Sequence, residues 1–456
     1  MAGIGFELRK LLSKESYASL FQAYAYAGII SSGPWILSIV GIMVIGLLSV
    51  TVVVPAYQVV QFQVSVTYIM VTSLVLTGTV QLAFTRFIAD RLYEKKDGLV
   101  LPNFNGLMLI VMAVSGVLGM AAVLLLFPQE SDAYRILLLS AFVIMCCIWV
   151  ATLFLSGMKQ YKEIVWLFAL GYAITVVAAL VLRKGGLEGL LLGFVIGHFV
   201  LLTGMITLTL RNYPSDRFIA FDFVRSGAMY PTLMVTGLFY NLGVWADKLL
   251  FWYFPDTGQD VIGPLRASLI YDLPVFLAYL AIIPGMAVFL VRIETDFVEY
   301  FHKFYNSVRE GGSLDFIEQM RDEMVFTIRQ ALFEIIKIQS IAVLVVFVAG
   351  PTLLRLAGIS ELYLSLLYVD VVAAGLQVVL LGLLNIFFYL DKRAYVMFLT
   401  ALFLILNLGL TAVTLQLGAA FYGYGFAVAL LITVFVAMRL LEHKLARLEY
   451  ETFMLQ

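Results

Sequence analysis

The chain has 456 residues, of which 62% are hydrophobic and 13% are charged, and its formal net charge is −1. Soluble domains usually contain about 45–50% apolar and about 25% charged residues, so this composition excludes an ordinary soluble protein. A mean hydropathy of +0.99 excludes a disordered chain, and the scattered basic residues exclude a nucleic-acid-binding surface. The sequence therefore predicts a multi-pass membrane protein.

Residues 1–22 precede the first long apolar run. Their apolar residues fall on one helical face, with the charged residues largely off it; these apolar positions are Ile4, Leu8, Leu11 and Leu12. This spacing suits an amphipathic helix on the inner surface of the membrane. A simple basic anchor before the first span is the alternative.

Twelve apolar runs follow, each long enough for a helix to cross the hydrocarbon core, which takes about 20 residues. The runs are 23–54, 61–84, 104–127, 134–156, 163–182, 187–210, 228–254, 265–291, 337–357, 362–390, 395–417 and 420–440. A β-barrel would show short alternating strands instead of unbroken runs. The predicted fold is therefore an all-α polytopic membrane protein.

Basic residues determine the predicted orientation. With the N-terminus in the cytoplasm, 23 of the 29 lysines and arginines fall on the cytoplasmic side, five fall outside and Lys248 lies within a span. Positive charges favour the cytoplasmic side of a membrane protein. We therefore expect a multi-pass protein with both termini cytoplasmic.

The twelve runs divide into two groups of six, which fits a parallel repeat of two six-helix units, as transporters often show. The expected parts are an N-terminal helix (1–22), an N-terminal lobe (23–212), a C-terminal lobe (213–440) and a cytoplasmic tail (441–456). Prolines inside a span kink the helix and free backbone carbonyls. The candidates for such kinks, and for gating, are Pro34, Pro231, Pro274 and Pro284.

The longest polar insertion, 292–336, lies on the predicted cytoplasmic side. Apolar residues recur in it at helical spacing on both sides of Gly311 and Gly312, which indicates a helix–turn–helix. The insertion is either a dock for a cytoplasmic partner or a helical pair packed against its own bundle or the membrane surface. The docking candidates are Phe297, Phe301, Phe304, Phe316 and Met320.

Enzyme signatures are missing from the sequence. The three histidines form no metal-binding motif with each other or with a cysteine, and no nucleotide-binding loop is present. We therefore expect no catalytic residues, no metal and no cofactor.

Ionisable residues inside the spans are the informative polar positions, because each one is costly in the hydrocarbon core unless it is shielded. At a rise of 1.5 Å per residue, Asp247, Lys248, Asp272 and Asp370 fall in one layer of the C-terminal lobe. Aromatic faces and carboxylates together suit the binding of sugars. Tyr240, Trp245 and Tyr271 complete the candidate substrate-lumen residues. A Lys248–Asp272 ion pair that locks two helices is the alternative.

Two N-terminal motifs carry a family resemblance. Residues 1–12 read MAGIGFELRKLL and residues 24–35 read YAYAGIISSGPW. This opening closely resembles that of PelG proteins, inner-membrane components of the Pel exopolysaccharide machinery of Gram-negative bacteria. The resemblance implies a protein of the bacterial inner membrane and membership in the multidrug/oligosaccharidyl-lipid/polysaccharide flippase superfamily, which is Wzx- and MATE-like. It also implies two six-helix lobes around a central cavity.

The same resemblance implies the cargo and the partners. The cargo would be an N-acetylgalactosamine-rich polymer, moved to the periplasm for the biofilm matrix. The partners would be the soluble glycosyltransferase PelF and the membrane proteins PelD and PelE, within the lipid bilayer and without nucleic acid. The resemblance assigns no functional residues.

Two functions stay open at this point. The first is a transporter that passes a growing polysaccharide and catalyses nothing itself. The second is an ion-coupled MATE-type exporter of small cationic molecules, in which Asp247, Asp272 and Asp370 would bind a cation or a proton. A glycosyltransferase subunit is a weaker interpretation, because the sequence offers no nucleotide-sugar site.

Overall fold

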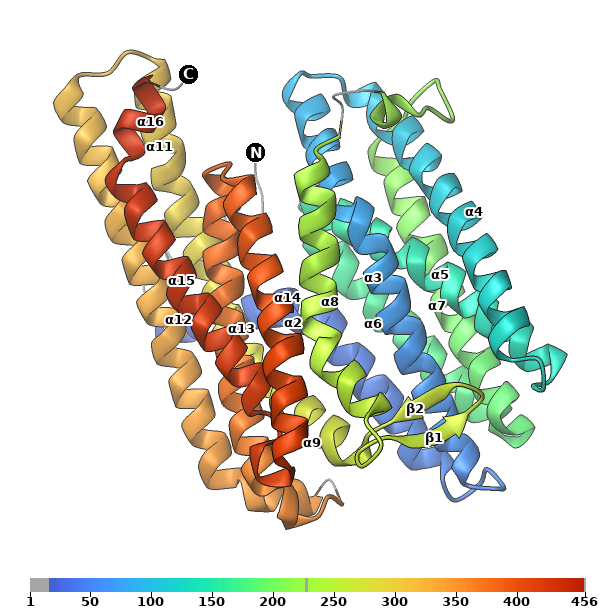
Figure 1. The fold of residues 1–456 in the computed structure, drawn as a ribbon. Coiled ribbons are helices and arrows are strands. Elements are labelled where there is room, and N and C mark those ends of the chain that lie inside the picture. The colour runs from blue at the N-terminus through green and yellow to red at the C-terminus, as the bar shows by residue number, and fades with distance from the viewer. Residues whose placement is uncertain (1–15, 159, 226–228, 357, 455–456) are drawn as a thin grey trace. The chain divides into compact units, whose positions relative to one another are not determined.

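The computed structural model describes residues 16–158, 160–225, 229–356 and 358–454, and nearly all of their regular structure is helical (Figure 1). The predicted amphipathic positions Ile4, Leu8, Leu11 and Leu12 lie outside the described residues. The helices before the first strand are α2 (Tyr17–Ser49), α3 (Tyr57–Tyr93), α4 (Val100–Leu126), α5 (Asp132–Gly157), α6 (Tyr161–Leu182), α7 (Gly186–Asn212) and α8 (Pro231–Tyr253). The strands β1 (Gln259–Ile262) and β2 (Leu265–Ala267) then form an antiparallel hairpin.

The later helices are α9 (Leu269–Tyr279), α10 (Ile283–Val291), α11 (Val298–Arg309), α12 (Leu314–Leu356), α13 (Leu364–Tyr389), α14 (Arg393–Leu417), α15 (Tyr424–Ala446) and α16 (Leu448–Met454). Each of the twelve predicted runs overlaps one of these helices, except 265–291, which contains the pair α9 and α10. The all-α membrane fold is therefore confirmed.

Nine helical stretches of the described residues are long and apolar enough to cross a membrane, and ten if the bent helix α2 counts as one span. One of the nine, Tyr161–Asn212, contains both α6 and α7. Helix α8 is not among the nine, since Asn241, Asp247 and Lys248 lower its hydropathy. The count of crossings therefore depends on how α2, the α6–α7 pair and α8 are treated.

The chain divides into two compact units, and each is described by itself. Unit 1 comprises Met1–Ser32, Ala246–Leu250 and Leu269–Gln456, and unit 2 comprises Gly33–Trp245 and Phe251–Ser268. These bounds differ from the predicted lobes 23–212 and 213–440, because the first part of α2 belongs with α10. A Cβ on Gly28 would lie 3.6 Å from side-chain atoms of both Ile283 and Ala287. Hydropathy locates a helix but does not identify its neighbours.

Unit 2 depends on close approach between helices at small residues. Helices α6 and α7 run antiparallel, and a Cβ on Gly193 would lie 2.4 Å from the Cα of Ala179. Helices α3 and α8 meet in the same way, since a Cβ on Gly237 would lie 2.1 Å from the carbonyl oxygen of Gly78. Small residues at such crossings let helices pack closely inside a membrane, where burial of apolar surface adds little.

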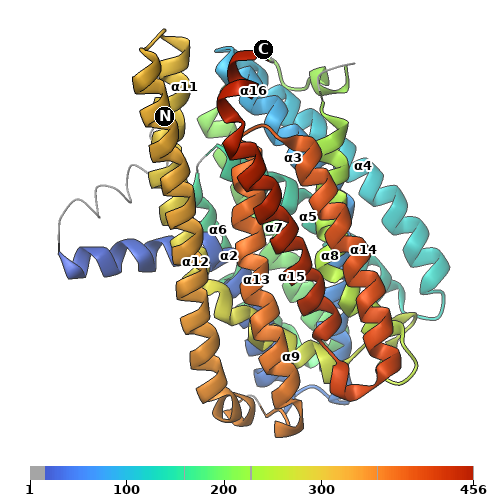
Figure 2. The same cartoon turned by 60° about the vertical axis from the view of Figure 1, so that its left-hand side comes forward.

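Unit 1 is built around α13, which packs against α9, α12 and α15 (Figure 2). A short 3₁₀ segment, Leu280–Ile282, separates α9 from α10. Gln339 on α12 donates from Nε2 to the carbonyl oxygen of Ala281 in that segment, at 3.0 Å. The backbone group freed by the break is thereby paired with a neighbouring helix, as the hydrocarbon environment requires.

The four candidate prolines have different places in the helices. Pro34 lies within α2, which is bent by 62° between Phe21–Pro34 and Ile36–Ser49, and Pro274 lies within α9. Pro284 lies at the start of α10, directly after the 3₁₀ break. Pro231 is the first residue of α8, so its predicted kink is wrong. At the first helical position proline lacks only an N–H that the helix leaves unpaired.

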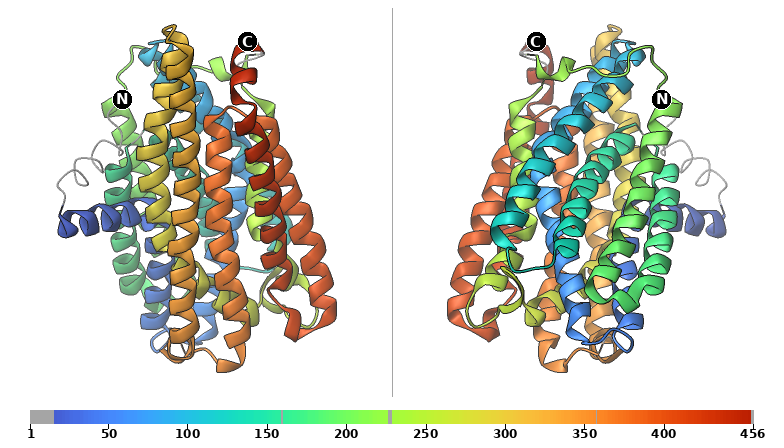
Figure 3. Two further views of the ribbon diagram at one scale, coloured as in Figure 1. Left: turned by 90° about the vertical axis from the view of Figure 1, so that its left-hand side faces the viewer. Right: turned by 90° about the vertical axis from the view of Figure 1, so that its right-hand side faces the viewer.

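The insertion 292–336 is a helix–turn–helix, as predicted (Figure 3). A π-helical segment, Arg292–Phe297, leads into α11, and the chain turns at Gly311, where φ is +72°, before α12 begins. Arg292 joins the base of the two helices: its guanidinium contacts Glu334 at 2.5 and 2.9 Å and Asp296 at 2.6 Å.

Most of the predicted docking side chains of this insertion are not available to a partner. Phe297 and Phe304 are fully buried, Met320 is buried and Phe301 is half-buried against Tyr389. The three buried side chains pack inside unit 1, which contradicts a docking role for them and favours the alternative of a helical pair packed against its own bundle. Phe316 remains exposed.

Candidate transport site

The predicted charged residues of α8 lie inside unit 1. The side chains of Asp247 and Lys248 are 0% and 3% exposed, respectively. The ammonium Nζ of Lys248 lies 3.0 Å from Oδ2 and 3.2 Å from Oδ1 of Asp247. This pairing with the adjacent residue differs from the predicted alternative, an ion pair with Asp272. A buried charge is tolerated when it is paired in this way.

Two further helices complete the shell around the Asp247 carboxylate. Tyr271 on α9 donates its hydroxyl to Oδ2 at 2.7 Å, and Asn407 on α14 donates Nδ2 to Oδ1 at 3.2 Å. Thr411 in turn donates to Oδ1 of Asn407 at 3.0 Å, which fixes the orientation of the amide. Asp247 therefore accepts hydrogen bonds from three different side chains, and the predicted partner Tyr271 is among them.

Aromatic rings cover the ammonium of Lys248. Its Nζ lies 4.7 Å from the ring centroid of Phe426 on α15 and 5.3 Å from that of Tyr279 on α9. Both distances are within the range of cation–π attraction, which is stronger where water is excluded. The hydroxyl of Tyr279 donates to Oε1 of Gln377 at 2.7 Å, so this ring is held in place.

Asp370 on α13 is the second buried carboxyl of this cluster. It is 2% exposed, and neither carboxylate oxygen has a hydrogen-bond partner among the described residues. Its Oδ1 lies against Gly423, the residue before α15, where a Cβ would come within 2.9 Å. The charges of Lys248 and Asp247 both act on this carboxyl.

The remaining lumen candidates do not join this cluster. Asp272 is half-buried on α9, one position round the helix from Tyr271. Tyr240 and Trp245 belong to unit 2, where Trp245 packs with its ring 6.3 Å from that of Trp252. The structure thus brings together four of the seven candidates: Asp247, Lys248, Tyr271 and Asp370. A role of any of the seven in a lumen stays a prediction.

Sequence reasoning missed the residues that complete the shell. Asn407 is a polar residue in the middle of the run 395–417, and that isolation was a usable signal. Phe426 and Tyr279 carried no signal, because aromatic residues are common throughout the spans.

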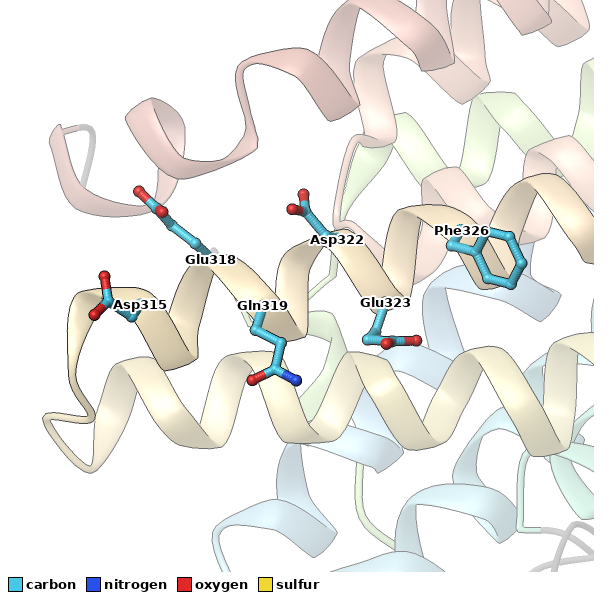
Figure 4. A pocket seen from close by; sticks show the side chains of 6 residues that line it. All are labelled: Asp315, Glu318, Gln319, Asp322, Glu323 and Phe326. Atoms are coloured by element: carbon cyan, nitrogen blue, oxygen red, sulfur yellow. The ribbon is translucent and has the colours of Figure 1, made fainter.

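A second polar feature lies on the N-terminal half of α12. Four acids and two neighbours line a hollow there: Asp315, Glu318, Gln319, Asp322, Glu323 and Phe326 (Figure 4). Glu318 and Asp322 point to one side of α12, and Gln319 and Glu323 point to the other. Arg321 partly compensates this charge, since it contacts Asp322 at 2.8 Å and Glu449 on α16 at 2.5 Å.

The described ranges contain no group of three or more His, Cys, Asp or Glu side chains arranged to hold a metal ion.

Comparison with known structures identifies the fold. An outward-facing multidrug resistance MATE transporter of the MOP superfamily matches with a TM-score of 0.64 and 15% identity, over 93% of this chain and 96% of that chain. MATE in the bent conformation matches with a TM-score of 0.66 and 15% identity, over 98% and 97%. A MOP superfamily transporter from Pyrococcus furiosus matches with a TM-score of 0.60 and 15% identity, over 93% and 96%. At such identities the likeness shows the fold alone, which is that of MATE transporters.

Comparison with protein families identifies the membership. Residues 1–453 match the family model described as "PelG: Putative exopolysaccharide Exporter (EPS-E)". No curated protein matches the chain. The match extends over nearly the whole sequence and agrees with the resemblance of the N-terminal motifs. The chain belongs to the PelG family of exopolysaccharide exporters.

Proposed function

We propose that this protein moves a Pel-type exopolysaccharide, rich in N-acetylgalactosamine, from the cytoplasm to the periplasm across the bacterial inner membrane. The observation that carries the proposal is the family match over residues 1–453. The MATE fold supports it, because that fold belongs to transporters. The chain supplies the passage and no catalytic step, and the polymer contributes to a biofilm matrix.

Orientation is part of the proposal. Both termini and the α11–α12 hairpin lie in the cytoplasm, where 23 of the 29 basic residues then fall. Helix α12 has 43 residues, about 64 Å at 1.5 Å per residue, roughly twice the hydrocarbon thickness. Residues 338–354 carry no charge, so that half of α12 spans the membrane and the half before Lys337 projects from it.

The projecting half of α12 is the proposed contact for a cytoplasmic glycosyltransferase that corresponds to PelF, with PelD and PelE as further partners. Phe326 is 63% exposed and lies 11 residues before Lys337, about 16 Å along the helix. That distance exceeds the depth of the headgroup layer, about 5–8 Å on each side, so lipid does not cover this ring. An exposed aromatic among carboxylates suits a basic protein surface with an apolar centre.

The experiment is co-purification of the tagged full-length chain from its native membranes, followed by mass spectrometry and an assay of secreted polymer. The variant E318Q/E323Q/F326A is expected to lose the glycosyltransferase and most of the secreted polymer while its membrane level is unchanged. Phe398→Ala is the matched control, since Phe398 is 51% exposed on α14 within a predicted span. Normal co-purification and secretion by the triple variant would exclude this docking face.

Ion-coupled export of small cationic molecules is the second candidate. One observation favours it: structural neighbours include a multidrug resistance MATE transporter. The buried carboxylate of Asp247 already has an ammonium partner in Lys248, which leaves less negative charge for a cationic substrate. Proton-dependent uptake of small cations into liposomes that contain this chain alone would favour this candidate over polymer export.

A further inference from the structure

The surroundings of the Lys248 ammonium have the composition of a binding site for a small cation. One side is a carboxylate, Asp247, at 3.0 Å, and two others are the ring faces of Phe426 and Tyr279. Carboxylates and aromatic faces are the groups that recognise ammonium ligands and other monovalent cations. The Lys248 side chain is only 3% exposed, so water does not compete with these contacts.

The shell is built independently of the lysine. Tyr271 and Asn407 fix the Asp247 carboxylate from α9 and α14, and Gln377 fixes the ring of Tyr279. Groups held by their own hydrogen bonds form a preorganised site, which costs little to occupy. These groups therefore form a cage suited to a cation, and the cation in it is the Lys248 ammonium.

We propose that Lys248 is a tethered cation: its ammonium permanently fills a carboxylate–aromatic cage in unit 1, so this cage does not take up a mobile Na⁺ or K⁺ ion during transport. The proposal goes beyond the proposed function, because it concerns the ions that the protein uses and not its cargo. A mobile cation would have to displace an ammonium that is covalently held beside its site and thus has a high effective concentration there.

Charge balance supports the assignment. If Asp370 is neutral, the cluster of Asp247, Lys248 and Asp370 has no net charge and needs no further ion. Asp370 makes no hydrogen bond among the described residues, and a buried carboxyl without a partner is less costly when it is neutral. Removal of the Lys248 ammonium leaves Asp247 with a buried negative charge and no cation, so the cage then requires one from solution.

The first test uses the wild-type full-length protein in detergent or nanodiscs. Its thermal midpoint is measured in NaCl, KCl and choline chloride at equal ionic strength, and binding is measured with ²²Na⁺. We expect the same midpoint in all three salts and no saturable Na⁺ binding. A midpoint that rises with NaCl or KCl to a plateau, with saturable binding that Asp247→Asn abolishes, would overturn the proposal.

The second test removes the tethered ammonium. Lys248→Met is expected to be less stable in choline chloride and to recover stability in NaCl or KCl with a saturating dependence. Lys337→Met, which removes an exposed lysine of α12, is the matched control and is expected to show no preference among the salts. If the single variant does not fold, Lys248→Gln replaces it with the same expected result, since glutamine removes the positive charge but leaves an N–H donor for the Asp247 carboxylate. A folded variant without preference for Na⁺ or K⁺ would sink the proposal.

The assay is independent of polymer export. Loss of the proposed function would appear as normal secretion without this chain, whereas failure of the tethered-cation proposal would appear as cation binding by the wild type.

Discussion

Oδ1 of Asp370 on α13 lies 2.9 Å from the position that a Cβ would take on Gly423, the residue before α15. Gly423 also has a φ of +82°, a conformation that other residues adopt at a cost. A side chain at 423 is therefore excluded both by the carboxylate and by the backbone. The glycine therefore lets a buried acid approach the first turn of α15 closely.

Gly423→Ala is expected to destabilise the protein by at least about 1–2 kcal/mol, the cost of a left-handed conformation for a residue with a Cβ. The Cβ would also lie 2.8 Å from Cδ1 of Leu366. Thermal unfolding of the purified protein measures the loss. Gly409→Ala on α14 is the control: a Cβ there meets nothing within 4 Å, and alanine is favoured in a helix. Equal midpoints for the two variants would contradict this reasoning.

Gly237→Ala is expected to separate α3 from α8. The new Cβ would lie 2.1 Å from the carbonyl oxygen of Gly78, which is backbone and has no rotamer to relieve the clash. Overpacking of this kind typically costs about 1–3 kcal/mol. Folded yield and thermal midpoint are the readouts, with Gly116→Ala on α4, where a Cβ meets nothing within 4 Å, as the control. If both alanine variants behave like the wild type, the close crossing of α3 and α8 is incorrect.

Asp247 and Asp370 are expected to respond differently to neutralisation. Asp247→Asn breaks a buried ion pair, which typically costs about 3–5 kcal/mol. Asp370→Asn removes a carboxyl that makes no hydrogen bond among the described residues, so we expect stability near that of the wild type. Urea or thermal unfolding compares the two variants, and the reverse order of stabilities would refute the described pairing.

The Asp370→Asn variant also tests a role in polymer passage. If Asp370 contributes to the lumen, Asp370→Asn protein is present at normal levels in the membrane while secretion of polymer falls. Unchanged secretion by a stable Asp370→Asn variant would remove this residue from the lumen candidates.

Glu451 on α16 is expected to make the packing of the C-terminal helix dependent on pH. Burial raises the pKa of this carboxyl, but the ammonium groups of Lys392 and Lys444, each 2.5 Å away, outweigh burial and lower it below its usual range. A lowered pKa in the folded state means that the contact stabilises α16 above the unfolded pKa, about 4.3. The stabilisation is lost as the pH falls through the lower folded value.

Hydrogen exchange in the C-terminal segment as a function of pH measures this effect. Glu451→Gln is expected to expose α16 at neutral pH as strongly as acid does in the wild type. Glu442→Gln is the control, because Glu442 is 64% exposed and its contact with Arg439 is long, at 3.5 Å. Protection of α16 that is equal in wild type and Glu451→Gln at neutral pH would disprove the role of this carboxylate.

Much of the fold could be predicted because hydropathy depends only on local sequence. The runs around α4 to α7, α13 and α14 differ from the helices by at most four residues at either end, whereas α3 continues nine residues beyond its run. The depth calculation also placed Asp247 and Asp370 in one layer, and both carboxyls occur in one buried cluster. Rise per residue is a fixed property of a helix, so depth follows from sequence alone.

Rotation about a helix and choice of neighbour are not local properties. Asp272 follows Tyr271 directly on α9 and therefore faces about 100° away from it. Phe426 and Tyr279, the residues that enclose Lys248, come from α15 and α9. Hydropathy does not specify which helices of the bundle are neighbours. For the same reason the sequence leaves open whether the apolar side of the α11–α12 hairpin faces a partner or its own bundle.

The uninterrupted course of α12 has a mechanical consequence. The N-terminal half of α12 carries the acidic hollow. Gln339 lies 25 residues after Leu314, about 38 Å along the axis. Its side chain donates to the carbonyl oxygen of Ala281, at the break between α9 and α10. A continuous helix resists bending, so a small tilt imposed at the N-terminal end of α12 is transmitted along the helix. A force applied to α12 outside the bilayer is thus transmitted to the 3₁₀ segment Leu280–Ile282, between α9 and α10.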